Sequence, residues 1–181
     1  MRKVLLASFT ILFAAASQAQ TSGDVTLNVN LNPIQTLVVL PSQTTVDLDY
    51  VTENDYASGV SAMQQNHLKI FSTGGFAVSV KASGDLTKSV SGGNGNIDAA
   101  SVRITASAGT NDALASASYT ANGVALSTGD QNIVTSTLGA VDKNININYA
   151  AAGANAYIDK YVAGQTATVF TTTVTYTIVA Q

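Results

Sequence analysis

The chain has 181 residues, of which 10% are charged, and it carries a formal net charge of −3 with a single histidine and no cysteine. Lysine and arginine are scattered singly after residue 19, so no basic stripe exists to neutralise the phosphates of a nucleic acid. The missing cysteines and the lone histidine exclude cysteine nucleophiles, disulfides and multi-histidine metal sites. We therefore expect a protein that is not an enzyme, has no cofactor and binds no nucleic acid.

The first 19 residues have the three parts of a secretory signal peptide. Met1-Arg2-Lys3 is a short basic region, residues 4–16 form an apolar run too brief to span a bilayer, and Ser17-Gln18-Ala19 has small residues where a signal peptidase cuts. We expect cleavage after Ala19, passage through the periplasm to the cell surface, and one domain over residues 20–181. No second apolar run has spanning length, so the mature chain should have no transmembrane segment.

Residues 24–31 alternate strictly between polar and apolar side chains. Val25, Leu27, Val29 and Leu31 would share one face of a strand, because side chains on a strand alternate sides with a period of two. This segment can be the first strand of its own domain, or it can be a strand that is lent to a neighbouring subunit. The same alternation serves both, so the sequence leaves pairing in cis or in trans open.

Further strands are predicted wherever alternation or β-branched runs recur between Gly, Asn and Ser. We find no convincing helix after the signal peptide. Many short strands without a helical period predict an all-β fold, an antiparallel immunoglobulin-like β-sandwich. The predicted strands are 24–31, 34–40, 44–50, 66–72, 75–82, 101–107, 132–135, 143–149 and 168–179.

The most distinct hairpin signal runs from Leu68 to Val80 around the pair Gly74-Gly75. Glycines tolerate the positive φ that tight hairpin turns need, so the strands on either side should pair. Residues 91–96, rich in Gly and Asn, should form an exposed loop. Residues 107–128 fit either a weak strand pair or a long surface excursion, and the sequence does not distinguish them.

The strongest strand closes the chain, with threonines on one face and apolar residues on the other. The threonine face is wettable, so the apolar face should point into the core. We predict a core that contains Phe76, Val78, Val80, Val102, Ile104, Ile145, Ile147, Val174, Tyr176 and Ile178.

Two groups of residues could carry chemistry. His67 begins a predicted strand without a partner motif, which favours a surface or strand-end histidine. Asp47, Asp49, Glu53 and Asp55 form an acidic cluster of the kind that calcium prefers, although its spacing lacks the turn of a known calcium motif and Asp47 and Asp49 fit the wet face of a strand. Structural calcium between Asp47 and Asp55 stays open, and we predict no catalytic residue and no metal ligand.

Seven tyrosines invite a search for a sugar-binding surface. Tyr50, Tyr149 and Tyr176 fall at alternation positions that should point inward. Of the tyrosines in loop-like surroundings, only Tyr157 and Tyr161 are close in sequence, so a binding platform would lie there.

The order of these features resembles the spore coat protein U-like family, the subunits of archaic chaperone–usher pili. The resemblance is carried by the signal peptide, the alternating strand Val25-Thr26-Leu27-Asn28-Val29, the segment Val46-Asp47-Leu48-Asp49-Tyr50, the hairpin signal from Leu68 to Val80, and the final strand that follows Gly164 and includes Thr173-Val174-Thr175-Tyr176-Thr177-Ile178. The chain departs from the family in having no cysteine and in having Asp49-Tyr50 where the family often has Phe-Gly.

The resemblance implies an incomplete sandwich whose missing strand is supplied by the N-terminal segment of the next subunit. The implied partners are copies of the chain or related subunits, a periplasmic chaperone and an outer-membrane usher. Val25, Leu27, Val29 and Leu31 would then form the polymerisation strand of a surface fibre or pilus. The alternative is a secreted module with a complete sandwich that binds cell-wall glycan or another surface ligand.

Overall fold

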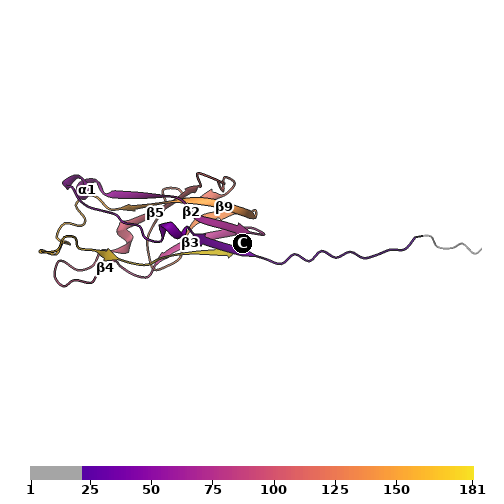
Figure 1. Cartoon of the computed structure of the whole chain (residues 1–181), viewed down its shortest axis with the longest axis horizontal. Helices are drawn as coiled ribbons and strands as arrows, with labels where there is room; N and C mark the ends of the chain where they lie inside the picture. Colours follow the sequence, from indigo (N-terminus) through magenta and orange to yellow (C-terminus); the bar gives the residue numbers. More distant parts are fainter. Residues whose placement is uncertain (1–21) are drawn as a thin grey trace, which may run out of the picture. The chain divides into compact units, whose positions relative to one another are not determined.

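The computed structural model describes residues 22–181, so the predicted signal peptide and its cleavage site lie outside the described residues. The chain divides after Leu31, and Asn32–Gln181 forms a compact body. The body consists of two facing antiparallel sheets (Figure 1), which confirms the predicted all-β sandwich. Within residues 22–181, no helix has the length and apolar character needed to cross a membrane.

The first sheet has five strands and the second has four. In spatial order, the first contains β1 (Gln35–Val39), β2 (Val60–Ser72), β9 (Ala140–Ala151), β5 (Val102–Ala108) and β7 (Val124–Ala125). The second contains β11 (Val174–Ala180), β3 (Phe76–Ala82), β8 (Gln131–Ser136) and β6 (Ser118–Tyr119). A separate pair joins β10 (Phe170–Thr171) to β4 (Thr87–Lys88).

The core lies between the two sheets and is built from the inward faces of β2, β3, β5, β8 and β9. Seven of the ten predicted core residues are buried, namely Phe76, Val78, Val80, Val102, Ile104, Ile145 and Ile147. The other three, Val174, Tyr176 and Ile178, are only half-buried, although they pack against the same cluster. All three lie on β11, which is the edge strand of the second sheet.

The predicted hairpin from Leu68 to Val80 is wrong, because β2 and β3 belong to different sheets. β2 pairs with β1 and β9, whereas β3 pairs with β11 and β8. Neither Gly74 nor Gly75 has a positive φ, so the connection is not one of the tight turns that align two strands. It carries the chain across the core instead, and the apolar faces of β2 and β3 meet through the interior.

Three short helical segments interrupt the strands: η1 (Pro41–Gln43), α1 (Glu53–Ser58) and η2 (Ala99–Ser101). α1 lies where no helix is expected from the sequence. It begins with a capping box in which the Thr52 side chain accepts from the Asp55 N–H and the Asp55 carboxylate accepts from the Thr52 N–H. Residues 91–96 are exposed as predicted, and residues 107–128 include the short strands β6 and β7.

Candidate functional site

Residues 24–31 belong to no strand of the described chain, so the predicted strand is not formed here. Their four apolar side chains are almost fully exposed, at 91% for Val25, 85% for Leu27, 75% for Val29 and 89% for Leu31. Side chains of this kind are buried once a strand is paired and packed. The segment therefore has the apolar pattern of a strand but no partner within residues 22–181.

A second predicted strand, residues 44–50, is also unpaired. Its side chains alternate as expected: Val46 and Leu48 are half-buried against the core, while Asp47 and Asp49 are exposed. None of the hydrogen bonds found in residues 22–181 involves a backbone group of residues 44–50. The predicted strand is wrong as an assignment of paired structure, because no neighbouring strand lies beside it.

One edge of β11 also has unpaired backbone groups. β11 pairs with β3 along one side, where Ile178 lies opposite Val78, and it has no strand on the other side. β1 lies near β11 without forming a ladder with it. Unpaired backbone groups on an edge strand next to half-buried apolar side chains are a template for another strand.

A groove of about 610 Å³ separates residues 44–50 from the chain that leads into β11. One wall is Val46–Val51, and the opposite wall is Thr166–Phe170. The floor contains the apolar residues Leu86, Ile97, Val102 and Ala151, and Asp47, Asp49 and Lys160 also line the groove. We name this groove, together with the free edge of β11, which follows Thr166–Phe170 in the chain, the acceptor groove. The groove offers apolar contacts, and the edge of β11 offers unpaired backbone N–H and C=O groups.

His67 is buried at 2% exposure beneath this region, so its prediction as a surface or strand-end residue is wrong. Its Nδ1 lies 2.9 Å from Oε1 of Gln43, and its Nε2 lies 3.0 Å from the hydroxyl of Tyr149. The Tyr149 hydroxyl is in turn 2.6 Å from the hydroxyl of Tyr176. This polar chain links β2 and β9 of the first sheet to the edge strand β11 of the second.

Burial lowers the pKa of His67, because a buried imidazolium loses its hydration. The rings that pack edge-on against it belong to Tyr149 and Tyr176, and neither supplies a negative charge at neutral pH. Burial also raises the pKa of the Tyr149 and Tyr176 hydroxyls. The network is therefore neutral at physiological pH and serves to hold β11 in place, not to transfer a proton.

The two interior residues His67 and Leu68 are consecutive, which a regular strand does not allow. The reason is Asn66, which has a positive φ of 52° at a shift in the β2–β9 register. Its backbone N–H donates to Oδ1 of Asn146 at 2.7 Å, and its own Oδ1 accepts from the N–H groups of Thr110 and Asn111. Asn tolerates this conformation better than most residues, and the bulge turns both following side chains inward.

The tyrosines do not form the predicted platform. Tyr157 is 9% exposed, and its hydroxyl lies 2.7 Å from that of Ser101, so its ring face is not free to stack on a sugar. It packs against Tyr50, with ring centroids 5.1 Å apart. Burial raises the pKa of Tyr50 to about 12. Only Tyr161 of the proposed pair is exposed, at 52%.

The acidic cluster has a structural explanation at one member. The Asp55 carboxylate accepts from the N–H groups of Val51 at 2.9 Å and Thr52 at 2.7 Å, and these hydrogen bonds lower the pKa of Asp55. Asp47 and Asp49 are exposed, as a wet strand face requires. Among residues 22–181, no three His, Cys, Asp or Glu side chains gather closely enough to hold a metal ion.

Comparison with known proteins adds no family to this description. No family model matches the sequence, and no curated protein is similar enough to indicate a relative. The resemblance to the spore coat protein U-like family thus stays a prediction, and functional inference depends on the geometry of the chain itself.

Proposed function

We propose that this protein is a secreted, non-enzymatic structural subunit of a cell-surface fibre or pilus. Copies assemble by strand complementation: residues 24–31 of one copy enter the acceptor groove of another and pair with the free edge of β11. The observation that carries this proposal is the combination, in one chain, of an exposed apolar strand pattern with an unpaired strand edge and a groove whose floor contains apolar residues. Each element is unfavourable in water alone, and strand addition relieves both.

The lengths of the two elements agree. β11 has seven residues, and the apolar positions from Val25 to Leu31 also span seven residues. Such a strand is roughly 23 Å long at about 3.3 Å per residue. Val25, Leu27, Val29 and Leu31 would all face the groove floor, while Thr26, Asn28 and Asn30 would face solvent.

The link between this segment and the body disfavours pairing in cis. Ile34 is already fixed, since its carbonyl accepts from the Thr73 N–H at 3.0 Å, which leaves Asn32 and Pro33 to reverse the chain. A type I′ turn needs positive φ at both central residues, which Pro33 cannot adopt. A type II′ turn needs glycine first, where this chain has Asn32. A tight hairpin onto β1 is therefore unfavourable, and a second copy is the better acceptor.

The test compares two variants of residues 24–31 that add the same charge, one on the apolar face and one on the polar face. We expect fibres from exported wild-type chain and from T26D/N28D, in which the two new charges face solvent. The variant L27D/V29D should form no fibres, because burying unpaired carboxylates in the groove is far more costly than truncating a buried Leu, itself about 2–5 kcal/mol. Electron microscopy of cells that express each form, together with light scattering of the purified chains, measures assembly.

A peptide of residues 22–32 shows whether a variant has lost the ability to donate its strand or the ability to accept one. L27D/V29D should still bind this peptide, and its melting temperature should rise with peptide concentration. The opposite result has two forms: a wild-type chain that stays monomeric at every concentration, or an L27D/V29D monomer that melts far below the wild-type monomer. Either would show pairing in cis and would favour the alternative of a complete surface-binding module.

A further inference from the structure

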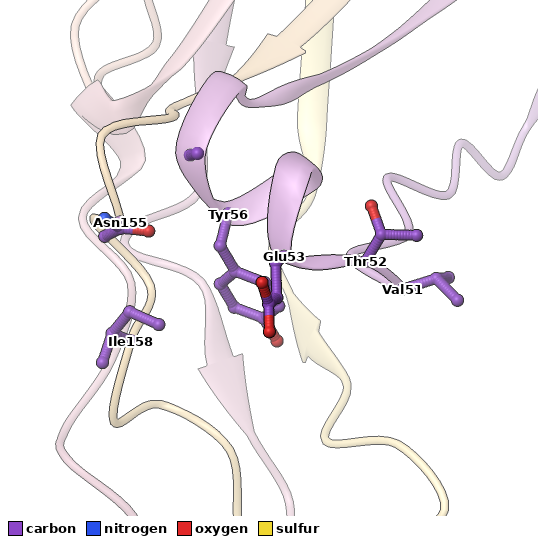
Figure 2. Close-up of a pocket in the computed structure, with 7 residues that line it drawn as sticks. Val51, Thr52, Glu53, Tyr56, Asn155 and Ile158 are labelled. Carbon is purple, nitrogen blue, oxygen red and sulfur yellow. The ribbon is translucent and has the colours of Figure 1, made fainter.

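Most large apolar side chains of the body that are about half-exposed or more lie toward its two ends, whereas Val38 and Met63 lie within β1 and β2. At the end that contains α1 they are Val51 at 81%, Ile158 at 52%, Tyr161 at 52% and Val169 at 69%. Val51 and Ile158 line a hollow of about 590 Å³ with Glu53 and Tyr56 between them (Figure 2). Tyr161 and Val169 line the neighbouring acceptor groove. We name this surface the α1 end.

The opposite end is where the body receives the N-terminal segment. Ile34 is bonded to Thr73 there, and the N–H of Gln181 donates to the carbonyl of Gly75. Ser72 lies opposite Ala140 in the β2–β9 ladder, which brings the turn before β9 to the same place. The exposed apolar side chains at this end, which we name the base, are Ile34 at 52%, Leu138 at 63%, Val141 at 67% and Val179 at 49%. Figure 1 shows α1 and the C-terminus at opposite ends of the sandwich.

The direction of a donated strand decides which ends meet. β11 runs toward the base, since its last residue, Ala180, lies opposite Phe76. A strand antiparallel to β11 would finish at the α1 end of the acceptor, and a parallel strand would finish at its base. In the parallel case each copy would use its base twice, once for the copy that receives its strand and once for the copy that donates a strand to it. The antiparallel arrangement instead brings the base of one copy to the α1 end of the next and can repeat without limit.

The linker is too short to keep the two bodies apart. Only Asn32 and Pro33 lie between the last apolar residue of the segment, Leu31, and the fixed Ile34. The three Cα-to-Cα steps from Leu31 to Ile34 span at most roughly 11 Å, and proline stiffens them. The base of the donor must therefore lie against the α1 end of the acceptor once the strand is seated.

We infer that the α1 end is a docking surface for the base of a second copy of this chain. This inference rests on the proposed strand complementation and adds a body-to-body interface to it. The partner surface is apolar, as the α1 end requires, and each body carries both halves of the contact. This pairing would cover the exposed apolar side chains at both ends, and clusters of exposed apolar side chains mark interaction sites.

The absence of cysteine in the chain makes cross-linking a direct test. The double variant L138C/I158C places one thiol at the base and one at the α1 end. Assembled chains treated with a short bismaleimide should give a ladder of covalent multimers in denaturing electrophoresis. The matched control is M63C/L138C, because Met63 is 53% exposed, like Ile158, but lies on β2 and lines neither hollow at the α1 end. We expect on the order of tenfold more multimer from L138C/I158C, since adjacent thiols react at a millimolar effective concentration.

The single variants decide between the possible arrangements. Neither L138C nor I158C alone should give more than background dimer. A strong dimer from L138C alone would mean that bases meet, and it would overturn the inference. Fibres of L138C/I158C without a ladder would also overturn it while leaving strand complementation intact. If the wild type forms no fibres and L27D/V29D binds no peptide of residues 22–32, the proposed function itself fails.

Discussion

Two neighbouring strands of the second sheet have similar sequences and different burial. β3 and β11 pair in register, with Ile178 opposite Val78 and Tyr176 opposite Val80. Both have apolar residues at alternate positions. Six of the seven residues of β3 are buried, whereas no residue of β11 is fully buried. β3 has a strand on each side, and β11 has a strand on one side only.

The difference teaches that the burial of a strand depends on its neighbours as much as on its own pattern. The inward residues of β11 touch the core, but within residues 22–181 no strand pairs with the outer edge of β11, and β1 only lies near it. Residues 44–50, on the far side of the acceptor groove, show the same partial burial for the same reason. In the proposed fibre, a donated strand would give β11 its second neighbour, and the half-buried side chains would become as buried as those of β3.

The largest expected effect on the free energy of unfolding comes from truncating an inward residue of β3, compared with an inward residue of β11. Both changes are made in L27D/V29D, which should not assemble. Phe76→Ala should lower the free energy of unfolding by about 3–5 kcal/mol, because Phe76 is fully buried and leaves a cavity. Ile178→Ala should cost less than about 2 kcal/mol, the low end of the range for a fully buried Ile, since Ile178 is only partly buried. Urea unfolding measures both.

Adding the peptide of residues 22–32 sharpens this comparison. The cost of Ile178→Ala should rise when the peptide is bound, while the cost of Phe76→Ala should stay the same. The exposed Val179 on β11 is the control, and Val179→Ala should change stability by no more than about 0.5 kcal/mol in either state. Equal costs for Phe76→Ala and Ile178→Ala without peptide would show that β11 needs no further neighbour.

A smaller effect is expected from a charge on the inward face of β11. Val174→Asp should cost about 1–3 kcal/mol in the same background, because the half-buried carboxylate can still reach water through the open groove. Peptide binding should be strongly weakened, since the donated strand would trap the charge without a partner. Thr175→Asp, whose side chain points to solvent, is the matched control. Unchanged melting and unchanged peptide binding of Val174→Asp would show that this face is not part of the acceptor.

Much of the sandwich follows from the sequence, because alternation with a period of two reports the inward face directly. This pattern predicts that Phe76, Val78 and Val80 lie in the core, and they are buried. Alternation does not say which strand lies next to which, so Gly74 and Gly75 suggest a hairpin turn although they connect two sheets. Alternation also does not report how many neighbours a strand has, so it predicts the same burial for Val174 as for Val80.

Two elements of the candidate site show other limits of such patterns. The inward turn of His67 depends on the bulge at Asn66, and that bulge is held by contacts with Asn146 and Thr110, far away in the sequence. The local sequence around Asn66 therefore does not predict the bulge. By contrast, α1 had a readable signal: Thr52 followed by Asp55 three residues later is a capping box, which the acidic cluster obscured.

The smallest expected effect concerns the polar chain that holds β11 to the first sheet. The pKa of His67 is lower in the folded chain than its ordinary value of 6.5, because burial disfavours the imidazolium. The folded state thus binds fewer protons than the unfolded state between these two pKa values. The contribution of His67 to stability is full above pH 6.5 and is lost as the pH falls from there through the folded pKa. Unfolding of L27D/V29D by urea should show this loss as the pH is lowered below 6.5.

His67→Gln removes the titration and keeps a polar side chain that can bond to Gln43 or Tyr149. The pH dependence of stability below pH 6.5 should be shallower in His67→Gln than in the parent, whereas the carboxylates are the same in both chains and should affect both alike. Because the His67 chain ends at Tyr176 on β11, protonation should also loosen the edge that receives the donated strand. Affinity for the peptide of residues 22–32 should then fall with pH in the parent and not in His67→Gln. Parallel stability curves for the two chains would mean that His67 stays neutral throughout and that its network holds β11 equally well at every pH.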